Sequence, residues 1–249
     1  MTDNEAKMLN SERKIALITG GSIRIGKAIS EYLLKRGWFV IVHYNKSRQE
    51  AGELALKNKN VMEIEHCDFT MPSSIKTFFE NLAEKHGRIS LLINNASSFI
   101  NDSIDNITPD TFGHNISVNS VAPLLLTKFF ASQGHFNNDV PGYVINLLDH
   151  TIKPNSDSFT SYSLSKNILE TTTKMMAEEF APKVLINGIA LGMVMRGTRE
   201  SEKHFEELCK QSLLKRPVAI SDLESTIEYI INNRSLTGEI IHLTCGLPQ

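Results

Sequence analysis

The feature that most constrains this chain is the alternation of short apolar segments with helical segments along its 249 residues. The apolar segments are rich in Ile, Val and Leu with little polar alternation, which is typical of strands covered on both faces. Strands separated in this way by helices are parallel and joined by right-handed crossovers. The sequence therefore predicts one α/β domain built on a doubly wound, parallel, seven-stranded sheet. The predicted strands are Ile15–Thr19, Phe39–His43, Met62–His66, Ser90–Asn94, Tyr143–Leu148, Val184–Ile189 and Glu239–Thr244.

Turn and capping residues indicate where the helices between these strands begin and end. Lys27–Arg36 ends before a glycine, which favours helix termination. Thr108, followed by proline, predicts the N-cap of a long helix over Asp110–Phe130. The pattern Ser221-Asp-Leu-Glu224 predicts a capping box that opens the last helix.

Length, charge and cysteine use narrow the classes of function. The length suits a single domain, here 14–249, preceded by a polar tail over residues 1–13 that we expect to be flexible. A net charge of −2 without a basic run gives no reason to expect nucleic acid or an anionic membrane as a partner. No apolar segment approaches the roughly 20 residues that span a bilayer. Three widely spaced cysteines and no signal peptide predict a cytoplasmic protein without a metal site.

A glycine-rich turn follows the first predicted strand directly and leads into a helix. It reads Thr19-Gly-Gly-Ser-Ile-Arg-Ile-Gly26. Glycines at such a turn let the backbone approach a pyrophosphate, which binds at the helix N-terminus. Gly20, Gly21 and Gly26 fit this role, while Arg24 stands where a glycine is usual. The turn predicts a dinucleotide site of the Rossmann type, with a plain strand-to-helix turn as the alternative.

The end of the second predicted strand indicates which dinucleotide is bound. NAD sites usually carry a carboxylate there that binds the ribose 2′-hydroxyl. This chain instead reads His43-Tyr-Asn-Lys46-Ser47-Arg48, with no carboxylate before Glu50. Cationic and hydroxyl donors suit a 2′-phosphate, which favours NADPH over NADH. The alternative is a solvated basic loop.

Two further strand ends carry polar or small residues. Asp68, just past the third strand, is placed to accept a hydrogen bond from the adenine amine. Asn94-Asn95-Ala96-Ser97 ends the fourth strand. Ligands bind at the carboxyl edge of doubly wound sheets, so both positions are expected to face the cofactor.

Tyr162 and Lys166 provide the clearest catalytic signal. They are four residues apart, so on a helix they share one face. A Lys⁺ beside a phenol favours the phenolate, so we expect Lys166 to lower the pKa of Tyr162 from the usual value of about 10. Tyr162 is then a candidate general acid for a substrate that has received a hydride, and Asp149 adds a second titratable group. The alternative is an exposed helix face with a solvated lysine.

Together these motifs resemble the short-chain dehydrogenase/reductase family over roughly Lys14 to Gly246. The motifs occur in the order typical of the family. The glycine-rich loop is followed by Asn-Asn-Ala at 94–96 and by Asn119 in the next long helix. Asp149 then stands at the position of the active-site Ser, and Tyr162–Lys166 supplies Tyr-x-x-x-Lys. The resemblance implies a homotetramer, proton donation by Tyr162, ribose binding by Lys166 and a water held by Asn119. It also implies a cofactor site made of Gly20, Arg24, Ile25, Gly26, His43, Asn45, Lys46, Ser47, Asp68, Phe69, Asn95, Ala96, Ser97, Lys166 and Gly192.

Three departures from the family pattern resemble its pteridine reductase branch. Asp149 stands where most members have Ser, and Arg24 and Ser97 stand where most have Gly. The run Asn-Ala-Ser-Ser-Phe, which ends at Phe99, is also similar to that branch. The resemblance implies that Phe99 stacks on a pterin, that Arg24 and Ser97 contact the cofactor phosphates and the pterin edge, and that Asp149 and Tyr162 complete the substrate site. The alternatives are a core role for Phe99, a turn cap for Asp149 and a surface carboxylate as partner of Arg24.

These features predict an NADPH-dependent oxidoreductase that reduces dihydromonapterin, dihydrobiopterin or dihydrofolate. A carboxyl group can relay a proton to a ring nitrogen or stabilise a cationic ring better than a serine can. The runner-up is a general short-chain carbonyl or 3-oxoacyl reductase using NADPH. A non-catalytic dinucleotide sensor on the same fold has little need for Tyr162 and Lys166. The polar segment Met193–Ser201 predicts a mobile lid over the substrate.

Overall fold

Seven parallel strands form one continuous sheet in the computed structural model, which describes residues 13–134, 136–150, 158–197 and 201–247. The strand order is β3-β2-β1-β4-β5-β6-β7, and each neighbouring pair is parallel. The predicted doubly wound α/β architecture is therefore confirmed, and every strand overlaps a predicted segment. The strands are β1 Ile15–Ile18, β2 Phe39–Tyr44, β3 Met62–His66, β4 Leu91–Asn94, β5 Gly142–Asp149, β6 Val184–Leu191 and β7 Ile240–Leu243.

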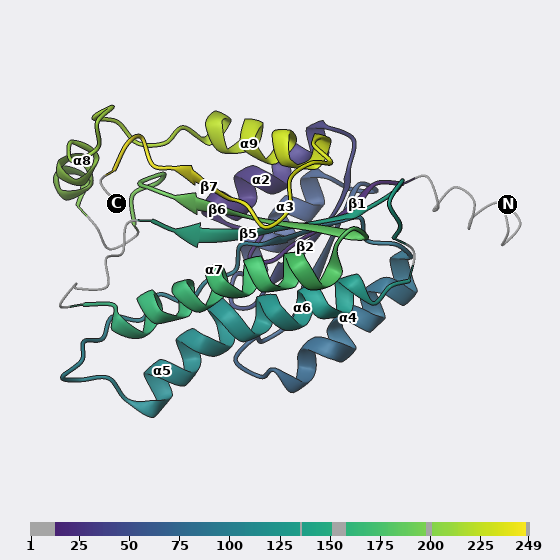
Figure 1. The fold of residues 1–249 in the computed structure, drawn as a ribbon, viewed down its shortest axis with the longest axis horizontal. Helices are drawn as coiled ribbons and strands as arrows, with labels where there is room; N and C mark the ends of the chain where they lie inside the picture. Colours follow the sequence, from purple (N-terminus) through teal and green to yellow (C-terminus); the bar gives the residue numbers. More distant parts are fainter. Residues whose placement is uncertain (1–12, 135, 151–157, 198–200, 248–249) are drawn as a thin grey trace, which may run out of the picture.

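Helices cover both faces of the sheet (Figure 1). They are α2 Arg24–Lys35, α3 Arg48–Lys57, α4 Ser73–His86, α5 Pro109–Ile116, α6 Ala122–Ala131, α7 Thr160–Phe180, α8 Glu202–Cys209 and α9 Ile220–Asn232. Residues of β1 alternate between two cores: Ile15 and Leu17 pack with α4, α6 and α7, whereas Ala16 and Ile18 pack with α2, α3 and α9. Because both faces of β1 are buried, this strand carries no polar alternation in the sequence.

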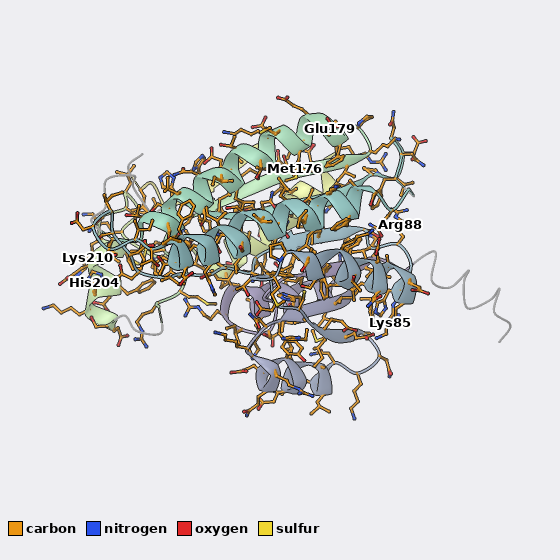
Figure 2. The ribbon with its side chains drawn as sticks, turned by 90° about the horizontal axis from the view of Figure 1, so that it is seen from below. Lys85, Arg88, Met176, Glu179, His204 and Lys210 are labelled. Atoms are coloured by element: carbon orange, nitrogen blue, oxygen red, sulfur yellow. The ribbon has the colours of Figure 1, made fainter. Side chains whose placement is uncertain are left out.

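The two ends of the sheet differ in what surrounds them. Seen from below, α6 and α7 run side by side along the strands (Figure 2). His204 and Lys210, in and just after α8, lie at the end toward which the strands point. Lys85 and Arg88, around the end of α4, lie at the opposite end. Helix α8 therefore lies near the carboxyl ends of the strands.

The long helix predicted after Thr108 has the expected position but is not α-helical throughout. Thr108 accepts a hydrogen bond from the Thr111 N–H at 3.2 Å, as expected of the N-cap. Between α5 and α6, Ser117–Val121 forms a π-helical turn, η1. Pro123 explains the turn, because proline has no N–H for the carbonyl of Asn119 and its ring would crowd that carbonyl in an α-helix. Such π turns occur frequently at functional sites.

The predicted capping box Ser221-Asp-Leu-Glu224 is wrong. Helix α9 begins at Ile220 with Ala219 as its N-cap, and no side chain caps it. Val218 is 3% exposed, and its N–H donates to the Met193 carbonyl at 2.7 Å. This anchor fixes the chain directly before Ala219, so the helix starts upstream of the sequence signal. Helix α2 also starts earlier than expected, at Arg24.

The order in which successive strands are added to the sheet reverses between β1 and β4. Strand β1 pairs with β2 on one side and with β4 on the other. The connections that follow β1 and β4 therefore diverge and leave a crevice at the carboxyl edge, where doubly wound sheets bind their ligands.

Parts of the predicted organisation lie outside the described residues. Of the tail predicted over 1–13, only Arg13 is described. Its guanidinium carbon lies 3.7 Å from the centroid of the Phe39 ring, and it donates to the Asn60 carbonyl at 2.7 Å. Arg13 itself thus contacts the domain.

Two further observations concern other kinds of function. No helix within the described ranges is long and apolar enough to cross a membrane. In those same ranges, no group of three His, Cys, Asp or Glu side chains is arranged to hold a metal ion.

Gly26 allows helix α2 to pass close to the loop that precedes it. A Cβ on Gly26 would overlap the Gly20 carbonyl oxygen and lie 2.5 Å from Asn95 Nδ2. Gly20 itself has φ +60°, in the left-handed region that favours glycine. The glycine pattern of the sequence is therefore a packing requirement of this turn.

We expect Gly26→Ala to lower the free energy of unfolding by about 1–3 kcal/mol, because the added methyl group overpacks a rigid turn. Urea denaturation measures this. Gly52→Ala is the matched control: Gly52 lies inside α3, and no heavy atom is within 4 Å of the position its Cβ would take. That variant should gain about 0.4–1 kcal/mol. A Gly26→Ala protein as stable as the wild type would contradict the assigned packing.

Candidate active site

Hydrogen bonds join the ends of β1 and β4 at the crevice. The buried Thr19 hydroxyl oxygen accepts from the backbone N–H groups of Asn95 and Ala96, each at 2.9 Å. Asn95 Nδ2 donates in return to the carbonyls of Thr19 and Gly20, at 2.8 and 2.9 Å. The predicted cofactor residues Gly20, Asn95 and Ala96 are therefore held together as one unit.

His43 supports the glycine-rich loop 20–26 from inside. The Gly20 N–H donates to His43 Nδ1 at 3.2 Å, and His43 Nε2 lies 2.9 Å from the Cys67 carbonyl. Nε2 is therefore the protonated nitrogen of a neutral ring. Burial lowers the pKa of His43 to about 4. Its ring stacks on Phe69 with centroids 4.0 Å apart. His43 and Phe69, expected to bind cofactor, are both buried; His43 bonds to the loop, and Phe69 packs on His43.

The donors predicted for a 2′-phosphate gather where β2 ends. Ser47 Oγ lies 2.6 Å from Ser22 Oγ of the glycine-rich loop. Lys46 and Arg48, on either side of Ser47, are exposed. The serine pair brings the loop and the end of β2 together, and the two cations flank that junction.

Asp68 lies beside the end of β2, as its position after β3 predicts. Its Oδ1 accepts from the Thr70 N–H at 2.9 Å, the Thr70 hydroxyl at 2.8 Å and Asn45 Nδ2 at 3.3 Å. The two hydrogen bonds from Thr70 lower the pKa of Asp68. The carboxylate is therefore fixed in place and ionised at neutral pH.

The catalytic candidates Asp149 and Tyr162 are hydrogen-bonded. Asp149 ends β5 and Tyr162 lies in the first turn of α7, and the Tyr162 hydroxyl donates to Asp149 Oδ2 at 2.8 Å. Tyr162 is 5% exposed. Burial first, and then the charge of Asp149 and its hydrogen bond, raise the pKa of Tyr162 well above 10, while a hydrogen bond with Ser97 acts in the opposite direction. Tyr162 is thus protonated at neutral pH.

The expectation that Lys166 lowers the pKa of Tyr162 is wrong for the protein alone. Lys166 is buried, and its Nζ donates to the Leu147 carbonyl at 2.9 Å. Its Nζ lies 5.8 Å from the centroid of the Tyr162 ring. Burial lowers the pKa of Lys166 to about 8, although Asp149 acts in the opposite direction. The same burial thus opposes ionisation of both residues. The alternative of a solvated lysine on an exposed face is also excluded.

Asn119 hydrogen-bonds to Ser97 and Ser98, in the segment that follows β4. It lies in the η1 turn, fully buried. Asn119 Oδ1 accepts from the Ser98 N–H at 2.7 Å and from the Ser97 hydroxyl at 3.2 Å. Asn119 Nδ2 donates to the Ser98 carbonyl and the Ser165 hydroxyl, each at 2.9 Å. Asn119 therefore links this segment to α7, which carries Tyr162.

Phe99 lies at the surface of the site. Its side chain is 57% exposed, which excludes a core role. The Phe99 ring contacts Tyr162 edge-on, with centroids 4.6 Å apart, and stacks on Phe159 at 4.2 Å. Sequence reasoning missed Phe159, although an aromatic residue three positions before Tyr162 was a usable signal. The two phenylalanines form an aromatic wall next to the Asp149–Tyr162 pair.

Arg24 connects the glycine-rich loop to the segment after β6. Its guanidinium donates to the carbonyls of Met195 and Arg196, at 3.2 and 2.8 Å. These backbone partners replace the surface carboxylate considered as an alternative. The predicted lid Met193–Ser201 is described except for residues 198–200, so its conformation as a whole lies outside the described residues.

Ile25 and Gly192 complete the predicted cofactor set. Ile25 is partly buried against the core of α2 and α9. The Gly192 N–H donates to the Leu243 carbonyl at 2.8 Å, and a Cβ there would lie 2.9 Å from Thr244 Cα. Glycine thus permits the close approach of the chain after β6 to the end of β7.

Comparison with known proteins identifies relatives of the whole domain. A family model described as short chain dehydrogenase matches residues 14–207. Dihydromonapterin reductase of Klebsiella pneumoniae is 26% identical, covering 97% of this chain and 99% of that protein. The enzyme of the same name from an Enterobacter species is 24% identical, with the same coverage.

Solved structures give the same relationship. The crystal structure of FolM alternative dihydrofolate reductase 1 from Brucella canis, complexed with NADP, has a TM-score of 0.86 and 29% identity, covering 94% of this chain and 93% of that one. A blue fluorescent protein from a metagenomic library, in complex with NADPH, shares the fold at 22% identity, with a TM-score of 0.83 and coverage of 96% and 100%. With the family model spanning most of its length, this chain belongs to the short chain dehydrogenase family of oxidoreductases.

Proposed function

We propose that this protein is an NADPH-dependent reductase of pterins, acting on dihydromonapterin, dihydrobiopterin or dihydrofolate. The observation that carries the proposal is the Asp149–Tyr162 hydrogen bond of 2.8 Å beside the exposed ring of Phe99. An acid pair next to an aromatic surface suits a flat heteroaromatic substrate that must be protonated on a ring nitrogen. The names of the relatives in Klebsiella and Brucella support this class of substrate.

The residues at the carboxyl edge fit NADPH. Gly26 lets the start of α2 lie close against the loop 20–26, where a pyrophosphate would bind at the helix N-terminus. Lys46 and Arg48 flank the Ser22–Ser47 pair and can bind a 2′-phosphate. Asp68, held ionised by Thr70, can accept a hydrogen bond from the adenine amine. Bound NADPH would supply the hydride for the reaction.

Phe99 and Ser97 are proposed to bind the substrate. A pterin ring can stack on the exposed part of Phe99, whose edge contact with Tyr162 fixes the ring at the acid pair. Ser97 is oriented by Asn119 and is available to the pterin edge or the cofactor phosphates. Arg24 contributes from the opposite side of the crevice, where it holds the carbonyls of Met195 and Arg196.

Proton transfer is proposed to run from Tyr162 through Asp149 to the substrate nitrogen. In the overall change the C=N carbon gains a hydride, the nitrogen gains a proton, and the double bond becomes single. The raised pKa of Tyr162 keeps the phenol protonated at neutral pH. The carboxylate of Asp149, which accepts that proton, can pass it on and stabilise positive charge on the ring. Lys166 is proposed to bind the nicotinamide ribose.

The location and assembly of the protein are further proposals. A cytoplasmic location and a homotetramer are what the family resemblance implies.

Assays of NADPH oxidation with a panel of dihydropterins test the function. We expect turnover of at least one dihydropterin, and weaker activity with NADH because Lys46 and Arg48 suit the 2′-phosphate. A ketone and a 3-oxoacyl thioester serve as comparison substrates. Turnover of those two with no response to any dihydropterin would establish the general carbonyl reductase instead. Binding of NADPH without any turnover would establish a dinucleotide sensor.

Asp149→Ser should lower pterin reduction by about 10²–10⁴-fold, the usual contribution of one acid–base group. Steady-state kinetics with the best dihydropterin measures the change. Asp139→Ser is the matched control, because Asp139 lies in the exposed loop before β5. An unchanged rate in Asp149→Ser would remove Asp149 from the mechanism.

The kcat/KM for NADPH should fall as the pH rises through about 8, because Lys166 loses its proton there. This parameter reports groups of the free enzyme. Tyr162 does not contribute to that limb, since its pKa lies well above 10. Asp149→Asn removes the charge that raises the pKa of Lys166, so the limb should move to lower pH in that variant. An alkaline limb that stays in place would show that Lys166 is not the titrating group.

A further inference from the structure

A buried carboxylate outside the acid pair lies at the start of the catalytic helix. Asp102, in the segment between β4 and α5, is 2% exposed. Its Oδ1 accepts from the Ser161 N–H at 2.9 Å and its Oδ2 accepts from the Ser161 hydroxyl at 2.5 Å. The Asp102 carbonyl also accepts from the Thr160 N–H at 3.2 Å. Both oxygens of this buried carboxyl group thus accept hydrogen bonds from one residue, the immediate neighbour of Tyr162.

Helix α7 needs this external cap. Phe159 is its N-cap residue, with φ 64° and no side-chain hydrogen bond to the helix. The first N–H groups of a helix have no partner within it, and a carboxylate is the most favourable substitute at this positive end. Asp102 satisfies the N–H groups of Thr160 and Ser161 from a position 59 residues before Ser161. The orientation of the first turn of α7 therefore depends on a distant segment.

The same contacts fix the segment that carries Phe99. Asn115 Nδ2 donates to the Ser161 hydroxyl at 2.6 Å, and Asn115 Oδ1 accepts from the Ile100 N–H at 3.5 Å. One residue before Phe99, Ser98 is held by Asn119. Segment 97–102 is therefore attached on both sides of Phe99, and its last attachment is Asp102 on α7.

We infer that Asp102 is a positioning residue, which acts through Ser161 to hold the proton donor Tyr162 and the aromatic ring of Phe99 in one rigid unit. The inference rests on the proposed function, because the two groups that it aligns are those assigned to proton transfer and substrate stacking. Burying a carboxylate is unfavourable unless it is fully hydrogen-bonded, so Asp102 favours this one arrangement of segment and helix. Asp102 does not touch the substrate in this assignment.

Substitutions of Asp102 test the alignment by kinetics. Asp102→Ala should lower kcat for the active dihydropterin by about 10- to 100-fold, because a displacement of about 1 Å at the reacting groups costs that much. The dissociation constant of NADPH should change by less than about twofold, since the cofactor loop has separate supports. Asp102→Asn should restore most of the rate, because Asn caps helices about as well as Asp.

A variant with a similar defect elsewhere on α7 separates positioning from stability. The Thr173 hydroxyl, buried farther along α7, accepts from Asn146 Nδ2 at 2.8 Å. Thr173→Val should lower the melting temperature, as Asp102→Ala does, but leave kcat within about twofold of the wild type. Equal kcat values in Asp102→Ala and wild type, or equal losses of kcat in Asp102→Ala and Thr173→Val, would overturn the inference.

Hydrogen exchange tests the inference independently of the substrate. In Asp102→Ala, amide exchange should accelerate about tenfold or more both in segment 97–102 and at residues 160–162, and Thr173→Val should change neither. Acceleration confined to one of the two segments would show that Asp102 does not couple them. If the wild type reduces no dihydropterin, the proposed function fails, and this exchange experiment still decides whether the coupling exists.

Discussion

The structure depends on the hydrogen bonds that join the chain beyond the carboxyl ends of β1 and β4. The Thr19 hydroxyl is 1% exposed and accepts two backbone N–H groups of the neighbouring strand end, while the Asn95 side chain reaches back to the glycine-rich loop. Backbone groups that leave a parallel sheet must find other partners when they are buried. At this switch point Thr19 and Asn95 supply them. The glycine-rich loop 20–26 and the segment that carries Phe99 therefore begin from one rigid junction.

Burial then determines the protonation states of the site. Burial raises the pKa of the acid Tyr162 and lowers the pKa of the base Lys166, because it disfavours the charged form of each. Both shifts favour the neutral form, and Asp149 is the charged group that both residues sense. For Tyr162 the carboxylate adds to the effect of burial, whereas for Lys166 it opposes it. Of these two residues, Lys166 is the one whose charge changes closer to neutral pH.

The sequence predicted what depends on local pattern and on the geometry of parallel sheets. Strand β1 was recognisable because both of its faces are buried, and Asp149 meets Tyr162 because the end of β5 and the start of α7 share the carboxyl edge. Sequence patterns did not predict features decided by distant contacts. The start of α9 depends on Val218 bonding to Met193, and the cap of α7 is Asp102, far upstream in the chain. The raised pKa of Tyr162 follows from burial and Asp149, which the spacing of Tyr162 and Lys166 does not reveal.

The charge of Asp149 distinguishes between the two classes of substrate that this fold could reduce. When a ketone receives a hydride, negative charge develops on its oxygen, and the carboxylate hydrogen-bonded to the proton donor opposes that charge. When a C=N bond is reduced, protonation of the nitrogen develops positive charge on the ring, which the same carboxylate stabilises. Across the 2.8 Å Asp149–Tyr162 hydrogen bond, burial of Tyr162 strengthens this effect. A serine at this position would favour neither substrate by charge, so the aspartate is the residue whose electrostatics argue for a pterin.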